Sequence, residues 1–430
     1  MKGFLIPLIS SCLLTATAFA QDGGVGLGVS VGTGWLVIPG NDAPGTAKGV
    51  GSSVGSNDTM VFGPIGSAGA AFELGRAGDI PLFLEMQGFY LSGTGDQTTA
   101  QTISGNTNIL LTSRAGPAGT VDLSAGTTPA GAIASAQTVL NFSGGGTSVV
   151  STTGTTLPAG GAQVSFGLNR GNGYALFGAA ATSADPLSAA SYGAVLDSNG
   201  LLIAGTGNLT GAVITSSSSV SASYGGLDLA LSAPLPLEHG WTLTPRLGPS
   251  YRRLSVDTKN ETIFDFAEPL GLPDRIPLVG LSVTQKMDAQ LLGLIAGLSI
   301  TAPIAVRWTA TAGIDAGLAV ISAGLHSGAA GLMQGSAPVN LPGQSSSFQG
   351  SSLIGRGDAS VSYLADNGTL FTLSGQLEYL SAIPVLRSDA PLAPGGSGSL
   401  TIPGPVQTST HIETAPLWIS SLSIAISRRF

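Results

Sequence analysis

The chain has 430 residues, of which 64 are glycine and only 9% are charged. An ordinary soluble domain is about 25% charged, so this chain carries far less charge than a surface in contact with water normally needs. Its 16 Lys and Arg residues against 24 Asp and Glu residues give a formal net charge of −8, which excludes a basic face for nucleic acid. No apolar run reaches the ~18 residues of a membrane-spanning helix.

The first 20 residues have the organisation of a secretory signal peptide. Lys2 provides a positive charge, residues 3–14 form an apolar core, and the Ala-Phe-Ala sequence at 18–20 is a cleavage site before Gln21. We therefore expect a mature chain exported through the inner membrane.

Cys12 is the single cysteine and lies inside this segment. The alternative interpretation, a lipoprotein cysteine, is disfavoured because the preceding Ile-Ser-Ser sequence matches that motif poorly. Cleavage before Gln21 leaves residues 21–430 with 15 basic and 24 acidic residues, a net charge of −9, and no cysteine for disulfide or thiolate chemistry.

Apolar residues then alternate with small or polar ones along ten segments, which is typical of strands with one apolar face. In the first segment, Val25 and Leu27 alternate with Gly26 and Gly28. In chain order the predicted strands cover about 25–35, 66–76, 82–90, 218–232, 241–252, 284–301, 305–320, 352–364, 371–379 and 418–430.

Residues 96–217, between the third and fourth predicted strands, contain few charges and much Gly, Ser, Thr and Ala. We interpret them as a long loop insertion. The alternative is that 163–168 and 174–179 form a further hairpin of the main sheet, which would give twelve strands instead of ten.

The connections alternate in length along the chain. The second and third predicted strands are joined by a tight turn at 77–79, and the eighth and ninth by an Asp-Asn-Gly hairpin at 366–368. The connections from the first strand to the second, the third to the fourth, the fifth to the sixth, the seventh to the eighth and the ninth to the tenth are long. Short periplasmic turns and long extracellular loops are expected of a transmembrane antiparallel up-and-down β-barrel, so we predict an all-β barrel of about ten strands.

Charged residues of the predicted strands fall on the face opposite the apolar one. An Arg or Lys side chain that points at lipid costs about 2–4 kcal/mol at the membrane midplane, so we assign these residues to the lumen as candidates for a selectivity lining. They are Glu73, Glu85, Asp228, Arg246, Arg252, Lys286, Asp288, Arg307, Asp315, Arg356, Asp358 and Glu378. The alternative is that they neutralise one another inside a narrow barrel.

The last strand ends on Phe430, preceded by alternating apolar residues. This pattern resembles the carboxy-terminal signature of bacterial outer-membrane barrel proteins, although Arg428 stands where an apolar residue is usual. The resemblance implies placement in the outer membrane of a Gram-negative envelope and recognition by the barrel-assembly machinery. The residues of this assembly signal are Trp418, Leu422, Ile424, Ile426 and Phe430.

The sequence offers little support for catalytic or metal-binding chemistry. The three histidines, His239, His326 and His411, are far apart in the sequence, and none lies in an oriented nucleophile–base pattern. The mature chain therefore offers no metal cluster, and we expect neither a cofactor nor an enzyme.

The sequence leaves three functions open. The first is a porin-like channel for passive passage of small polar solutes. The second is a non-conducting surface barrel that acts through its long loops, in adhesion or surface protection. An outer-membrane enzyme ranks third. A single-channel recording would separate the first two.

Overall fold

The computed structural model describes residues 25–40, 58–113, 118–128, 131–140, 147–148, 152–154, 161–168, 173–182, 187–266, 276–389, 398–404 and 409–429. The predicted signal peptide, with Cys12, and the terminal Phe430 lie outside these residues. No helix among the described residues has the length and apolar character needed to cross a bilayer.

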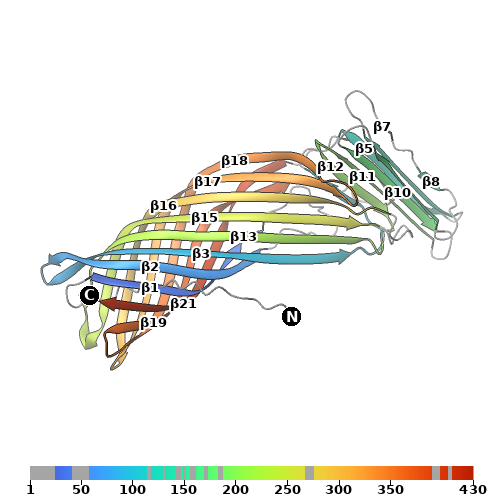
Figure 1. The fold of residues 1–430 in the computed structure, drawn as a ribbon. Helices are drawn as coiled ribbons and strands as arrows, with labels where there is room; N and C mark the ends of the chain where they lie inside the picture. The colour runs from blue at the N-terminus through green and yellow to red at the C-terminus, as the bar shows by residue number, and fades with distance from the viewer. Residues whose placement is uncertain are drawn as a thin grey trace.

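Ten long antiparallel strands form a closed ring (Figure 1). Each strand pairs with the next long strand along the chain, and the first pairs with the last, β1 with β21. The prediction of an antiparallel up-and-down β-barrel with ten strands is confirmed. The strands are β1 (Val25–Ile38), β2 (Thr59–Ala77), β3 (Ile80–Thr102), β13 (Val213–Ser232), β15 (Thr242–Asp265), β16 (Val279–Ala305), β17 (Trp308–Met333), β18 (Val339–Leu364), β19 (Thr369–Asp389) and β21 (Ser409–Arg429).

The connections β2–β3, β13–β15, β16–β17 and β18–β19 lie at one end of the barrel, which we call the short-turn end. The β13–β15 connection contains the short strand β14 (Leu235–Pro236) and the 3-10 turn η2 (Glu238–Gly240). The opposite end is the head end. The strands extend further toward it than predicted, so that β17 and β18 are joined by residues 334–338 alone.

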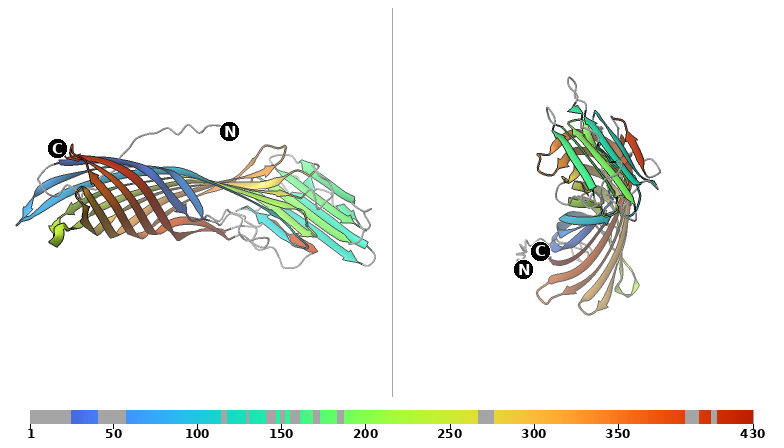
Figure 2. Two further views of the ribbon diagram at one scale, coloured as in Figure 1. Left: turned by 90° about the horizontal axis from the view of Figure 1, so that it is seen from below. Right: turned by 90° about the vertical axis from the view of Figure 1, so that its right-hand side faces the viewer.

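The segment between β3 and β13 folds into a separate β-structure, which we call the head (Figure 2). Its inner sheet has the order β4-β12-β11-β10-β9, and its outer sheet has the order β20-β5-β6-β7, with β8 also paired to β6. The inner strands are β4 (Ile109–Thr112), β9 (Gly161–Leu168), β10 (Tyr174–Thr182), β11 (Ser188–Asp197) and β12 (Gly200–Gly207). The outer strands are β5 (Gly119–Thr128), β6 (Gly131–Leu140), β7 (Thr147–Ser148), β8 (Thr152–Gly154) and β20 (Ser399–Ile402).

The hairpin predicted as a possible eleventh and twelfth barrel strand does form, as β9 and β10, but it pairs within the inner head sheet. The barrel therefore keeps ten strands. Strand β20 comes from the β19–β21 connection and pairs with β5, so a second, distant part of the chain completes the outer head sheet.

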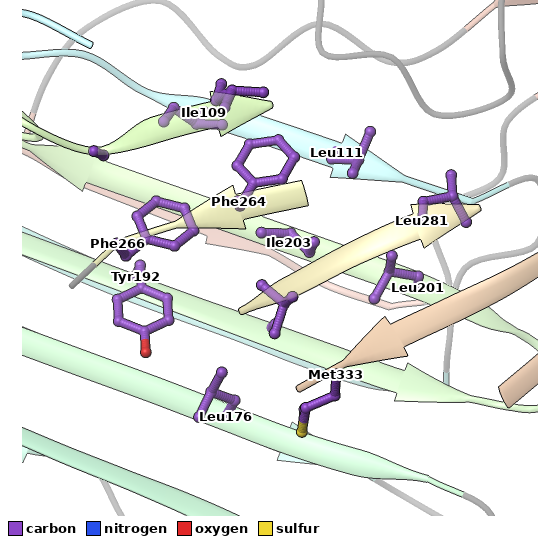
Figure 3. Packing of buried hydrophobic residues seen from close by; sticks show 14 of the residues in the cluster. Ile109, Leu111, Leu176, Tyr192, Leu201, Ile203, Phe264, Phe266, Leu281 and Met333 are labelled. Atoms are coloured by element: carbon purple, nitrogen blue, oxygen red, sulfur yellow. The ribbon is translucent and has the colours of Figure 1, made fainter. Parts of the chain in front are cut away.

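The inner head sheet is covered on both faces. One face packs against the outer head sheet through residues such as Phe177 and Leu123. The other packs against the head ends of the barrel strands, where Tyr192 stacks on Phe266 with ring centroids 4.5 Å apart (Figure 3). Leu281 of β16 belongs to this second core. The molecule is thus layered at its head end as barrel wall, inner sheet and outer sheet.

Candidate functional site

Near the short-turn end, the outer face of the barrel is apolar. Trp308 packs on Tyr363 with ring centroids 5.1 Å apart, and Tyr379 packs on Trp418 at 4.5 Å. The first pair adjoins the short turns, whereas Tyr379 lies ten residues after Thr369, the start of β19. A membrane-crossing strand needs about 9–11 residues, so the two aromatic pairs bound a lipid-facing belt. Exposed apolar side chains of this belt include Leu229, Leu247, Leu294, Ile314, Leu373, Leu422, Ile424 and Ile426.

Toward the head end, the apolar face changes sides. On β16, Leu292 is 65% exposed on the outer face, while the adjacent Leu291 is fully buried in the lumen. Beyond this point the outer positions are polar: Lys286 pairs with Asp257 of β15 at 3.4 Å. We call the part with the lipid-facing belt the lower barrel and the part beyond it the upper barrel.

The lumen of the upper barrel is filled by a core that we call the apolar plug. Every barrel strand contributes to it. Its members are Leu36, Ile38, Val61, Ile65, Leu91, Val220, Ala222, Tyr224, Leu254, Val256, Ala289, Leu291, Ala319, Ile321, Ala323, Leu325, Ile354, Leu380, Ile383, Leu386, Leu417 and Ile419. Burial of such side chains contributes about 1.5–3 kcal/mol for each large one, so the plug stabilises the barrel from inside.

The lumen of the lower barrel holds a continuous series of alternating acidic and basic side chains, which we call the charge chain. The nitrogen–oxygen distances along it are 2.5–3.3 Å. In order, the charge chain is Glu378, Arg252, Asp228, Arg356, Asp315, Arg246 and Asp358.

Arg252 is at the centre of the most buried part, with 1% of its side chain exposed. Its two terminal nitrogens donate to Asp228 at 2.6 and 3.1 Å, and its Nε donates to Glu378 at 2.9 Å. The guanidinium also lies 4.9 Å from the ring centroid of Phe89. The hydroxyl of Tyr224 donates to the same Glu378 at 2.5 Å. A buried charge is tolerated when it is paired and hydrogen-bonded in this way.

The charge chain crosses the lumen instead of following the wall. Asp228 on β13 and Arg356 on β18 bond at 2.7 Å, although their strands are four places apart in the ring. Tyr224 on β13 and Glu378 on β19 are five places apart, which is directly opposite in a ring of ten. Side chains from facing walls therefore meet at the centre of the barrel.

Two glycines make room for the charge chain. A Cβ atom at Gly297 of β16 would collide with Oδ1 of Asp315, which lies directly opposite on β17. A Cβ at Gly226 would lie 2.7 Å from both Arg252 and the Phe89 ring. Both positions are glycine because side chains of the lumen approach the backbone closely there, and not because the backbone needs a conformation that favours glycine.

Eight of the twelve charged residues predicted to line the lumen do lie there. Seven form the charge chain, and the eighth, Glu85, accepts a hydrogen bond from Ser232 at 2.5 Å. Glu73 lies at the short-turn end, 3.7 Å from Arg76. Whether any of them selects ions remains a prediction.

The structure contradicts the lumen assignment for three residues. Lys286 and Asp288 lie on the outer face of the upper barrel, where Asp288 pairs with Arg253 at 2.5 Å. Arg307 lies in the β16–β17 turn and pairs with Asp366 at 2.5 Å. The first two were misassigned because the apolar face of β16 changes sides at Leu291, and the third because β17 begins only after it.

Below the charge chain, toward the short-turn end, the lumen contains a polar cavity. Its empty volume is about 790 Å³, including the solvent at its mouth. The cavity is lined by hydroxyl, amide and charged side chains, among them Gln87, Arg246, Ser299, Thr311, Asp358, Ser360, Ser374, Gln376 and Ser423. Among the described residues, the hydroxyls of Ser299 and Ser360 are buried without a hydrogen-bond partner, which is typical of groups that bind water.

The three histidines stay apart. His239 lies in η2 at the short-turn end, and Nδ1 of His326 is 2.9 Å from Oγ of Ser345 on the upper barrel's outer face. His411 hydrogen-bonds Glu413 at 3.1 Å, and this bond holds the pKa of the Glu413 carboxyl below its ordinary value. Among the described residues, no group of His, Cys, Asp and Glu is arranged to hold a metal ion.

No protein-family model matches the chain, and no curated protein matches it either. Among solved structures, the outer membrane protease OmpT from Escherichia coli is similar at 7% identity and a TM-score of 0.36, over 95% of this chain and 97% of that one. A Pseudomonas aeruginosa FadL homologue is similar at 8% identity and a TM-score of 0.22, over 95% and 91%.

Proposed function

We propose that this protein is a closed outer-membrane barrel whose working part is the β-structured head held outside the cell. The signal peptide would direct export, the barrel-assembly machinery would insert the barrel, and the lipid-facing belt would anchor it. The short-turn end would face the periplasm and the head the exterior. The protein would act by contact at the surface and not as an enzyme.

The filled lumen is the observation that carries the proposal. A solute that entered the polar cavity would meet the charge chain, whose arginines bond carboxylates on facing walls. Above that it would meet the apolar plug, and then the inner head sheet, which packs on the head ends of the barrel strands. Breaking a buried ion pair costs about 3–5 kcal/mol of stability, because the remaining charge stays buried without a partner.

The head supports a contact role by its construction. It is a two-sheet structure with its own core between the sheets. It therefore presents a surface of defined shape, which a flexible linker would not. Its inner sheet is fixed to the barrel by the aromatic cluster around Tyr192 and Phe266. A rigid mount of this kind holds a binding surface in a defined orientation above the membrane.

The direct test is conductance in a planar lipid bilayer. We expect no stable current steps from the purified protein across the full range of applied voltage. Insertion is verified in the same membrane by protease, which should cleave the head from one side only and leave the barrel strands protected. Reproducible current steps from correctly inserted protein would contradict the proposal.

A passive channel is the second candidate, and the polar cavity favours it. Its hydroxyl-rich lining is suited to small polar solutes. Conduction would require the charge chain and the plug to rearrange, so the same recording distinguishes the two functions.

A further inference from the structure

Glu85 of β3 lines the polar cavity of the lower barrel without a charged partner. Its Oε1 accepts a hydrogen bond from the hydroxyl of Ser232 at 2.5 Å. Among the described residues, its carboxylate forms no ion pair, and its second oxygen has no hydrogen-bond donor. An ionised carboxylate has about four acceptor positions, so most of those of Glu85 stay unused.

Asp358 of β18 lines the same cavity from the facing wall, because β18 lies five places from β3 in the ring of ten. Its Oδ1 accepts one bond from Nη2 of Arg246 at 3.3 Å, the longest contact in the charge chain. Within the described part of the chain, its Oδ2 has no donor. Two facing carboxylates are therefore only partly compensated by the protein.

The charges of the lower lumen do not balance. Among the described residues, three arginines face five acidic side chains there, an excess of two negative charges. A negative charge inside a barrel wall is costly unless a positive charge lies close by. The acidic residues are Glu85, Asp228, Asp315, Asp358 and Glu378, and the basic ones are Arg246, Arg252 and Arg356.

Neutral oxygen atoms lie along the cavity between the two carboxylates. Ser299 is 3% exposed and Ser360 is 7% exposed, and in the described part of the chain neither hydroxyl has a partner. Gln376 donates its amide nitrogen to Glu378 at 3.4 Å, so its amide oxygen remains available as an acceptor. Carboxylate, amide and water oxygens are the ligands of hard cations such as Mg²⁺ and Ca²⁺.

The space suits a small ion with part of its water shell. The cavity has about 70 Å³ for the centres of water-sized molecules, whereas one water needs about 10–15 Å³. An ion with a few waters fits into this space. A large organic cation does not.

We propose that the polar cavity binds one hydrated divalent cation of the Mg²⁺ or Ca²⁺ kind, held by Glu85 and Asp358 and by the hydroxyls of Ser299 and Ser360. Its two positive charges match the excess of two negative ones. Because only two carboxylates take part, the ion keeps most of its water, and no group of three acidic or histidine ligands is needed among the described residues. The site requires only the folded lower barrel and is independent of the role of the head.

The experiment uses Mn²⁺ as a paramagnetic probe, because it takes the same oxygen ligands. The mature protein is refolded in a non-ionic detergent without lipopolysaccharide and freed of metal with EDTA. Electron paramagnetic resonance then measures the free Mn²⁺ that remains during a titration at pH 7.5. We expect one saturable Mn²⁺ site per chain, from which MgCl₂ or CaCl₂ displaces the probe and NaCl of matched ionic strength does not.

Variants locate the ion. Glu85→Gln removes one charge but keeps the shape of the side chain and an acceptor for Ser232, and it should weaken Mn²⁺ binding at least tenfold. Asp358→Asn makes the same change on the facing wall, should have a similar effect, and serves if the first variant does not fold. Glu73→Gln is the matched control, because Glu73 lies on β2 at the short-turn end and is not part of the cavity lining. It should bind as the natural protein does. Heat-modifiable migration on gels shows whether each variant is folded.

The proposal is overturned if the natural protein shows no saturable Mn²⁺ site, which would mean that Glu85 is neutralised by a proton and that the cavity holds only water. It is also overturned if the folded Glu85→Gln and Asp358→Asn variants bind Mn²⁺ as tightly as the natural protein, or if Glu73→Gln weakens binding equally. Either of these results would place the ion outside the cavity. Displacement by NaCl would reduce the effect to the screening of surface charge.

Discussion

The lower and upper barrel are made of the same ten strands but are built on opposite plans. In the lower barrel, apolar side chains face lipid and ionic side chains meet in the lumen. In the upper barrel, ion pairs lie on the outer face and apolar side chains fill the lumen. The change occurs within single strands, for example between Leu291 and Leu292. The solvent outside the wall therefore determines which face is apolar, while the hydrogen-bonded ladder continues unchanged.

The charge chain and the apolar plug fill the lumen of a long barrel in different ways. A lower barrel filled with apolar residues would be apolar on both faces, with no charge to fix one arrangement of its interior. A network of ion pairs across the lumen supplies specific partners, although its net contribution to stability is modest. The plug is placed where the outer face is already polar.

The largest expected effect comes from the pair Arg252 and Arg253, which are neighbours on β15 with opposite orientations. Replacement of Arg252 by Leu leaves Asp228 and Glu378 buried with fewer partners and should cost about 3–5 kcal/mol of the free energy of unfolding. Arg253→Leu removes an exposed pair with Asp288 and should leave the urea midpoint unchanged. Urea titration in detergent, monitored by tryptophan fluorescence, measures both. Equal effects would mean that the two faces do not differ in the way described.

The second prediction sharpens the boundary between the two regions. Leu291→Ala opens a cavity in the plug and should cost about 2–5 kcal/mol. Leu292→Ala acts on a lipid-facing side chain that is 65% exposed, and it should cost clearly less. The same urea titration applies. If Leu292→Ala were the more damaging change, the assignment of the inner face on β16 would be inverted.

The smallest effect concerns space within the lower barrel. Gly297→Ala places a methyl group against Asp315 and should cost about 1–3 kcal/mol, the usual range for overpacking. Gly357 of β18 is the matched control, because a Cβ there would meet nothing within 4 Å. Thermal unfolding followed by circular dichroism should show a lower midpoint for Gly297→Ala and no loss for Gly357→Ala. A tolerated Gly297→Ala would mean that the charge chain is looser than its distances imply.

The sequence predicts the ring but not the length of its strands. Alternation is strongest where the outer face meets lipid, and most of the predicted strands end near that boundary. Beyond this boundary, the apolar residues lie on the inner face of the strand. A prediction that keeps the apolar residues on the same face along the whole strand therefore assigns Met287 and Ala289 to lipid and Lys286 to the lumen. The signal of the change is present as consecutive apolar residues, Leu291 and Leu292, where strict alternation fails.

The residues of the charge chain could be predicted from the sequence, but the ion pairs that they form could not. Asp228 and Arg356 are recognisable as inward-facing from the periodicity of their own strands. Which of them meet depends on the register of each hairpin and on which strands stand opposite one another in the closed ring. Tyr224 and Phe89 were missed, because an inward aromatic residue resembles an ordinary core residue.

The head gave no clear strand pattern, and its burial explains why. Strands β10, β11 and β12 are covered on both faces, so their sequences are runs of Ala, Gly and Leu without alternation. Such runs do not distinguish a loop from a buried sheet.

Strand β20 has a consequence for the order in which the molecule is assembled. Thr401 of this strand bonds to Asp122, 279 residues earlier in the chain, and β21, which follows it, closes the ring against β1. Head and barrel are therefore both completed by strands that lie close together in the chain, β20 and β21. Contacts between such distant residues form slowly, so until β20 and β21 are in place, both sheets present open edges that can pair with other chains.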